Sequence, residues 1–312
     1  MDFLLVLLGL ALLFAGGEGL VRGAVAMAER LGVSKLVIGL TIVGMGTSFP
    51  ELLVSLRAAL AGSSDIAIGN VVGSNISNVL VILAVAALVA PIAGWNGNVK
   101  RDALFGVAGA FLLMLLGFSG GIGRFAGFAM VAILAVYLYY VYRQEQVDPP
   151  PLVDHFDEEV HERLAPRLAV AFVLGGLTLL FAGAEALVSG AVSIAQSFGL
   201  SERVIGLTIV AIGTSLPEMA ASVAAAKRGH TDVAIGNIAG SNAFNTLGIL
   251  GLSSIIRPMA ISPGMAAIDI PLMTAVLAGL AAMVFKLKVL TRNAGLAMLG
   301  VYALYVGVLL AI

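Results

Sequence analysis

The chain has 312 residues, of which 60% are hydrophobic and only 11% are charged, with a net charge of −1 and no cysteine. A soluble domain carries about 25% charged residues, so this composition excludes a soluble globular protein. Without cysteine there are no disulfides or thiolate metal sites, and no basic run suggests nucleic-acid binding. We therefore expect an all-α polytopic membrane protein.

Apolar runs close to the ~20 residues needed to cross a bilayer predict about ten membrane spans. The first run is longer than the apolar core of a secretory signal and has no basic segment before it, so we expect it to remain as an anchor. The predicted spans are 3–29, 36–62, 65–91, 102–119, 123–143, 168–196, 203–228, 232–255, 266–286 and 293–312.

The sequence repeats itself. Between Val37–Leu80 and Val204–Leu247, 26 of 44 aligned positions are identical. We expect two five-helix halves, 1–143 and 168–312. Residues 144–167, which contain Pro149-Pro150-Pro151 and several acids, are expected to be a cytoplasmic linker. A regulatory cation site formed by these acids with His155 and His161 is the alternative. Because five is odd, the second half should enter the membrane inverted.

The distribution of Lys and Arg gives an independent test, because these residues favour cytoplasmic loops. With the N-terminus outside, thirteen of them fall on the cytoplasmic side. The other side receives four, namely Arg57, Arg124, Arg203 and Arg257. The pattern predicts an inverted 5+5 repeat with both termini outside, in the cell membrane.

The segment Gly46-Thr47-Ser48-Phe49-Pro50-Glu51 returns as Gly213-Thr214-Ser215-Leu216-Pro217-Glu218. Pro50 and Pro217 lack an amide hydrogen and should interrupt their spans near the bilayer centre. The freed carbonyls and the carboxylates of Glu51 and Glu218 then need partners that lipid cannot supply. A dehydrated cation is such a partner, and the neighbouring hydroxyls share a helical face with the glutamates. These hydroxyls are Thr47, Ser48, Thr214 and Ser215.

A second motif follows each first one. Asn70, Ser74 and Asn78 are spaced four residues apart, and so are Asn237, Ser241 and Asn245. Glycines within the motif should let neighbouring backbones approach closely. All the donors are hard oxygens, which suit Ca²⁺ or Na⁺, and Mg²⁺ less well because it dehydrates reluctantly. Two carboxylates balance one divalent ion or two monovalent ions.

The paired GTS-x-PE and GN-x-x-GSN-x-x-N motifs resemble the α-repeats of the sodium/calcium exchanger family, in the cation/calcium exchanger superfamily, prokaryotic type. The resemblance implies that Glu51 and Glu218 are the central Ca²⁺ ligands. It also implies alternating access, in which the first and sixth spans slide across the other eight and several Na⁺ ions exchange for one Ca²⁺. The remaining ligands that the resemblance implies are Thr47, Ser48, Ser74, Thr214, Ser215 and Ser241 for Na⁺, with Asn78, Asn245 and the carbonyls near Gly44 and Ala211.

Asn70 and Asn237 are expected beside the ligands, where they could pin neighbouring helices. Asn245 stands where some relatives have an acid, which leaves the exact ion count open. Glu18 and Glu185 recur in the first and sixth spans and could line an access path or pair with Arg22. No bound cofactor is expected, and the expected partners are the lipid bilayer, Ca²⁺ and Na⁺, with a single chain sufficient.

Three other functions are alternatives to the Na⁺/Ca²⁺ antiporter. A proton-coupled Ca²⁺ exchanger on the same scaffold stays open, although that branch carries GNA-x-E in place of GTS-x-PE. An ion channel fits less well, because channels favour rings of subunits around a pore. An intramembrane enzyme with Ser48 or Ser215 as nucleophile lacks a base nearby, so no enzymatic activity is expected.

Overall fold

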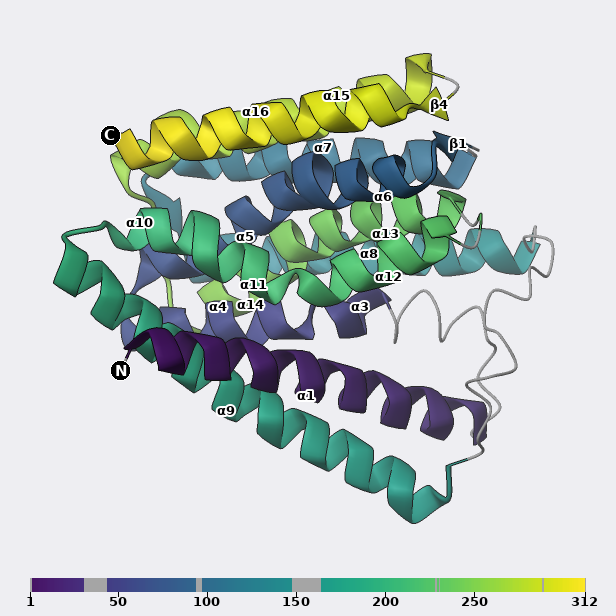
Figure 1. The fold of residues 1–312 in the computed structure, drawn as a ribbon, viewed down its shortest axis with the longest axis horizontal. Helices are drawn as coiled ribbons and strands as arrows, with labels where there is room; N and C mark the ends of the chain where they lie inside the picture. Colours follow the sequence, from purple (N-terminus) through teal and green to yellow (C-terminus); the bar gives the residue numbers. More distant parts are fainter. Residues whose placement is uncertain are drawn as a thin grey trace.

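The computed structural model describes residues 2–30, 44–93, 97–147, 164–227, 229, 231–287 and 289–311. Long helices lie side by side and form one bundle (Figure 1), which confirms the expected all-α membrane fold. Within the described residues, seven helices are long and apolar enough to cross a membrane, or eight if one bent pair counts as a span. The full set of ten spans stays a prediction.

The first half begins with a long helix and continues through a broken one. Its helical elements, in chain order, are α1 (Asp2–Arg30), α3 (Gly44–Thr47), α4 (Phe49–Ala61), α5 (Ser64–Ser77), the π-helical η2 (Asn78–Leu83), α6 (Ala84–Val89), α7 (Gly97–Phe118) and α8 (Arg124–Val147). The second predicted span, 36–62, lies partly outside the described residues. The third, 65–91, is the unbroken series α5, η2 and α6.

The second half repeats this order. Its elements are α9 (Pro166–Phe198), α10 (Glu202–Ile205), η4 (Gly206–Val210), α11 (Ala211–Thr214), α12 (Leu216–Lys227), α13 (Thr231–Ala243), η5 (Phe244–Ile249), α14 (Leu250–Ile256), η6 (Met265–Asp269), α15 (Ile270–Lys286) and α16 (Arg292–Ala311). Helix α8 runs past the predicted end at 143 and α9 begins before 168. The linker with His155 and His161 otherwise lies outside the described residues.

Helices α1 and α9 show that the halves are inverted. The two helices run in opposite directions along each other (Figure 1). Glycines spaced seven residues apart form the contact: a Cβ on Gly16 would lie 2.8 Å from the Gly176 carbonyl oxygen, and one on Gly183 would lie 2.9 Å from that of Gly9. Such close backbone approach is the packing that small residues permit in membranes.

Two short sheets tie the halves together at opposite ends of the bundle. Strand β1 (Ile92–Ala93) pairs with β4 (Val289–Leu290), and β2 (Gly121–Ile122) pairs with β3 (Met259–Ala260), both antiparallel. Each pair joins one strand from each half. In the repeat, β1 corresponds to β3 and β2 corresponds to β4, so the two pairs are symmetric copies of each other. The N- and C-termini lie at the same end of the bundle (Figure 1), as an even number of crossings requires; which side that end faces stays a prediction.

The nearly abutting second and third spans are joined by a tight turn. Helix α4 ends at Gly62, whose φ of 94° is left-handed, and α5 starts at Ser64. Gly229 has a φ of 83° at the corresponding turn of the second half. A residue with a side chain is strained at such angles, so glycine sets the position of both hairpins.

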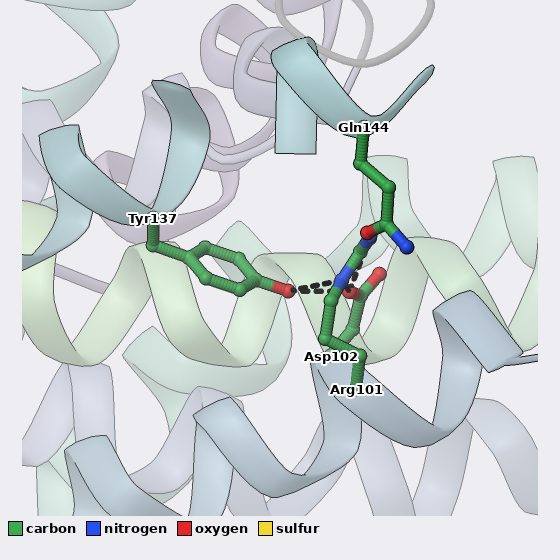
Figure 2. A network of polar contacts seen from close by, with 4 residues as sticks. All are labelled: Arg101, Asp102, Tyr137 and Gln144. Carbon is green, nitrogen blue, oxygen red and sulfur yellow. Dashed lines mark hydrogen bonds and ion pairs between the residues drawn. The ribbon is translucent and has the colours of Figure 1, made fainter. Parts of the chain in front are cut away.

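Polar networks link neighbouring helices of each half. Figure 2 shows Asp102 of α7 accepting a hydrogen bond from the hydroxyl of Tyr137 on α8 and from Arg101 Nε at 2.8 Å, while Arg101 Nη1 reaches Gln144 Oε1 at 2.7 Å. The second half repeats the acid and the tyrosine at the opposite end of the bundle. There, Asp269 accepts a hydrogen bond from the hydroxyl of Tyr305 on α16 and forms an ion pair with Arg203 of α10.

The four cations on the predicted outer side all have partners in the structure. Arg57 forms an ion pair with Glu185, and Arg203 forms one with Asp269. Arg124 donates to the Ile255 carbonyl and Arg257 to the Leu60 carbonyl. Each contact joins elements far apart in the chain, so these four arginines have structural uses that compete with the charge bias of the loops.

Candidate functional site

Each predicted break falls where its proline requires it. Helix α3 ends at Thr47 and α4 starts at Phe49, with Ser48 between them and Pro50 in the first turn. In the second half, α11 ends at Thr214 and α12 starts at Leu216, and the helices on either side of Ser215 meet at 44°. Both serines therefore lie at interruptions that place hydroxyl and backbone groups inside the bundle.

The two interruptions face each other through reciprocal hydrogen bonds. Ser48 Oγ donates to Glu218 Oε1 at 2.8 Å, and Ser215 Oγ donates to Glu51 Oε1 at 2.9 Å. Both glutamates are fully buried. The bonds run from one half to the other in both directions, as an inverted repeat demands. The structure thus brings Glu51 and Glu218 into one buried site between the halves.

Several oxygen atoms of this region have no hydrogen-bond partner within the described part of the chain. These atoms are Glu51 Oε2, Glu218 Oε2, Asn75 Oδ1, Asn78 Oδ1, Asn245 Oδ1 and Ser241 Oγ. A buried polar atom without a partner costs free energy, so each one calls for an explanation. All except Asn75 Oδ1 belong to residues that the sequence nominates as ligands, and all six are oxygen atoms suited to a hard cation.

The threonines of the first motif lie beside the carboxylates. Thr47 interacts with Glu218, and Thr214 interacts with Glu51. The Thr214 hydroxyl also donates to Asn70 Oδ1 at 3.0 Å and to the Val210 carbonyl at 3.1 Å. Both threonines are buried. They join the serines and glutamates in one hydroxyl-lined, water-poor region.

Asn70 connects the two motifs of the first half. Its Nδ2 donates to Ser55 Oγ at 2.8 Å and to the backbone carbonyl of Glu51 at 3.2 Å, while its Oδ1 accepts from Thr214. Because both ends of the amide are hydrogen-bonded to protein groups, Asn70 holds neighbouring parts of the site in place. Asn237 makes the matching bond to Ser222 at 3.2 Å.

The first glycine-rich motif lies against the second broken helix. A Cβ on Gly73 would lie 2.5 Å from the Leu207 carbonyl oxygen, so only glycine permits this approach of α5 to η4. Ser74 Oγ then donates to the Ala211 carbonyl at 3.3 Å. That carbonyl, expected as a ligand, also accepts from the Ser215 amide at 3.2 Å. Gly44 starts α3 at the edge of the described residues.

Asn78 and Asn245 lie at π-helical segments. Asn78 starts η2 and Asn245 is the second residue of η5, and both side chains are fully buried. Asn78 Nδ2 donates to Asn242 Oδ1 at 2.9 Å, whereas neither amide atom of Asn245 has a partner in the described chain. Single-turn π segments occur frequently at functional sites, and these two coincide with the predicted ligands.

Two other acids of the repeat lie outside the site. Glu18 is exposed on α1 and forms an ion pair with Arg22, one of the two roles expected for it. Glu185 is exposed on α9 and pairs with Arg57 of α4, a partner that the sequence did not suggest. Neither side chain contributes charge to the buried site.

Sequence reasoning overlooked the asparagines of the GSN triplets. Asn75 and Asn242 are fully buried, and Asn75 Nδ2 donates to Thr246 Oγ1 at 2.7 Å. Their recurrence at aligned positions in the two copies was a signal that could have identified them. Ser55 and Ser222, which hold Asn70 and Asn237, recur in the same way.

The described residues contain no group of three or more His, Cys, Asp or Glu side chains placed so that they could hold one metal ion. The negative charge of the site therefore comes from two carboxylates, and its other donors are neutral hydroxyl, amide and carbonyl oxygens. This set suits a cation that is bound and released more than one held permanently.

Comparison with known proteins decides the family. The chain matches the family described as "Sodium/calcium exchanger protein" over residues 1–143 and 168–311. The chain belongs to the sodium/calcium exchanger family. It is 36% identical over 312 residues to the sodium/calcium exchanger MaX1 of Methanosarcina acetivorans, with 88% of this chain and 89% of the relative covered. It is 35% identical over 270 residues to the inner membrane protein YrbG of Escherichia coli, with 83% and 81% covered.

A solved structure shares the fold. The sodium-calcium exchanger NCX_Mj, soaked with Na⁺ and Sr²⁺, superposes with a TM-score of 0.68 at 28% identity and covers 98% of this chain and 97% of its own. Membership in this exchanger family makes the chain a multi-pass membrane transporter that exchanges cations including Ca²⁺. It is not an enzyme, and no covalent cofactor is involved, as expected.

Proposed function

We propose that the protein exchanges Na⁺ for Ca²⁺ by alternating access, with the ions bound between the two halves at Glu51 and Glu218. One observation carries the proposal. The two buried carboxylates are joined across the repeat by reciprocal serine bonds, and each keeps one oxygen without a partner in the described chain. Two negative charges match one Ca²⁺ or two Na⁺, so the ions can replace one another without leaving a large net charge.

The proposed ligands beyond the carboxylates are the nearby neutral oxygens. Asn78, Asn245 and Ser241 present oxygen atoms without partners in the described chain, which supports direct ligation. Thr47, Thr214, Ser48 and Ser215 lie at the carboxylates, and their hydroxyls can turn toward a monovalent ion. Asn70 and Asn237 hold neighbouring groups instead. The remaining members of the set are Ser74 and the carbonyls of Gly44 and Ala211.

The packing of α1 and α9 supports the proposal that these two helices are the part that moves. The glycine contacts hold these helices together as one body, and α1 covers both interruptions. Leu10 packs onto Gly213, and a Cβ on Gly17 would lie 3.7 Å from Pro50 Cγ. Displacing the pair along its axis would uncover the site from one end. A small cavity already borders Ser215 and Ser77.

The coupling ion is proposed as Na⁺ on the chemistry of the first motif. Each interruption offers two hydroxyls beside a carboxylate, and hydroxyl oxygens are ligands for Na⁺ rather than proton carriers. A proton-coupled exchanger remains the second candidate, because a buried carboxylate that binds no metal can take up a proton instead.

The experiment is ⁴⁵Ca²⁺ uptake into proteoliposomes of the purified protein, with Na⁺, K⁺ and pH gradients imposed separately. Uptake should follow an outward Na⁺ gradient, vanish when Na⁺ is equal on both sides, and persist when a protonophore collapses the pH gradient. Liposomes without protein provide the background. Uptake driven by a pH gradient in the absence of Na⁺ would favour the proton-coupled exchanger and overturn the assignment.

A further inference from the structure

The amide of Asn78 is held by an asparagine from the opposite half. Asn242 belongs to α13, yet its Oδ1 accepts from Asn78 Nδ2 at 2.9 Å. Both side chains are fully buried, so water does not compete for the bond. Asn78 Oδ1, at the other end of the same amide, has no partner in the described chain.

An asparagine amide has one donating end and one accepting end. Only the carbonyl oxygen can bind a cation, and the NH₂ group would repel one. An unrestrained Asn78 could present either end to an ion, because the amide rotates about its last bond. The bond to Asn242 restricts this freedom, since it pairs the NH₂ group with an accepting oxygen and leaves the Asn78 oxygen available. Asn242 Nδ2 has no partner of its own in the described chain, so Asn78 can turn over only together with Asn242.

The symmetry-related pair does not form the same bond. By the repeat, Asn75 should hold Asn245, but Asn75 Nδ2 instead donates to Thr246 Oγ1 at 2.7 Å and to the Asn242 carbonyl at 3.3 Å. Thr246 itself donates to the Asn242 carbonyl at 3.0 Å. The position aligned with Thr246 in the first half is Val79, whose side chain has no hydroxyl to compete in this way.

We propose that Asn242 is a positioning residue that turns the Asn78 carbonyl oxygen toward the transported cation, and that Asn75 has no such role for Asn245. This inference rests on the proposed function, in which Asn78 is a ligand. One half of the site is then pre-organised for a cation, while Asn245 is free to reorient. Such a division suits a site that must accept ions of different charge and number in turn, because a fully fixed set would favour one ion alone.

The test compares alanine substitutions at the two symmetric positions. Losing one buried hydrogen bond that orients a ligand should raise the KM for Ca²⁺ in Asn242→Ala about tenfold, with kcat within about twofold. Asn75→Ala, the matched control, should leave the Ca²⁺ KM within about twofold even if it lowers thermal stability. A purely structural loss would reduce the maximal rate per protein and leave the KM unchanged.

Two further variants test the positioning role of Asn242 separately from the role of Asn78 as a ligand. If Asn242 acts through Asn78, adding Asn242→Ala to Asn78→Ala should change the Ca²⁺ KM by less than about twofold. Asn242→Asp keeps the accepting oxygen at the same place, so it should not raise the KM.

The possible failures are distinguishable. Asn78→Ala with an unchanged KM would reject Asn78 as a ligand, and with it this part of the proposed function. A raised KM in Asn78→Ala together with a wild-type KM in Asn242→Ala would reject only the positioning role. Equal effects of Asn242→Ala and Asn75→Ala, or a tenfold rise in Asn242→Asp, would also overturn it.

Discussion

Replacing either glutamate by glutamine isolates the charge of the proposed ion site. In Glu218→Gln the side-chain oxygen can still accept from Ser48, whose Oγ lies 2.8 Å from Glu218 Oε1. The NH₂ group then takes the place of Oε2, the oxygen without a partner in the described chain. Shape and the serine bond are kept, while a negative acceptor becomes a donor that repels a cation.

The magnitude follows from Coulomb's law. A carboxylate about 4 Å from a divalent ion, at an effective dielectric constant of about 20, attracts it by about 8 kcal/mol. Dehydration of the ion and the carboxylate offsets most of this attraction. If about a third survives, the loss is about 2.7 kcal/mol, which lowers Ca²⁺ affinity roughly 100-fold. Glu51→Gln should behave alike, because Ser215 forms the equivalent bond at 2.9 Å.

Affinity is measured by Ca²⁺-dependent thermal stabilisation of the purified protein and by ⁴⁵Ca²⁺ uptake in proteoliposomes. Glu18→Gln is the matched control, since it makes the same chemical change on an exposed side chain of α1 and should stay within about threefold of the wild type. Ca²⁺ affinity within tenfold of the wild type in either buried variant would refute the reasoning, because that carboxylate would then not face the ion.

Three other substitutions probe the site and its frame. Asn245→Asp should tighten Ca²⁺ binding and shift the reversal potential of exchange, and it breaks no hydrogen bond of the described chain, because neither amide atom of Asn245 has a partner there. An unchanged reversal potential and affinity would contradict this. Asp269→Asn should destabilise the protein by about 3 kcal/mol, seen as a lower Tm in detergent, because it removes the carboxylate that pairs with Arg203, whose side chain is 15% exposed. A wild-type Tm would count against it. Gly183→Ala should lower both Tm and transport, because it overpacks α1 against α9 at a cost of about 1–3 kcal/mol. Gly175→Ala is the control: nothing lies within 4 Å of its new Cβ, so Tm and transport should both stay at wild-type values.

The site could be nominated from the sequence because its chemistry is local. Proline, glutamate and hydroxyl residues lie within six positions of each other, and the helix break they imply appears at Ser48 and Ser215. The repeat then supplied the second copy and the inversion, which the antiparallel α1 and α9 display. Spacing along one helix was sufficient for these inferences.

Other features depend on which helices become neighbours, and spacing does not encode that. Arg57 could be read only as an outer-side cation, although its partner Glu185 lies on a distant helix. Asn75 and Asn242 look alike in the two motifs, yet Thr246 gives them different partners. The π-helical register at Asn78 likewise depends on packing among helices and is not readable from composition.

The sequence differences between the two halves bear on whether the inward-open or the outward-open state is favoured. An inverted repeat with identical halves would have inward- and outward-open states of equal free energy, because exchanging the halves converts one state into the other. Any preference must come from residues without a copy. Arg57 ties α4 to Glu185 of α9, and Arg203 ties α10 to Asp269, while the aligned positions in the other half are Ala224 and Leu36.

Both unmatched ion pairs are formed in the conformation seen here, and a pair that breaks in the mirror state stabilises this conformation relative to it. The Arg57–Glu185 pair links the α1–α9 body to the helix that carries Glu51, and it must break or rearrange if that body slides. Exposed pairs contribute at most about 1 kcal/mol, which is roughly a fivefold bias in population. A bias of that size favours one state while leaving the other thermally accessible, and an exchanger must visit both states to complete its cycle.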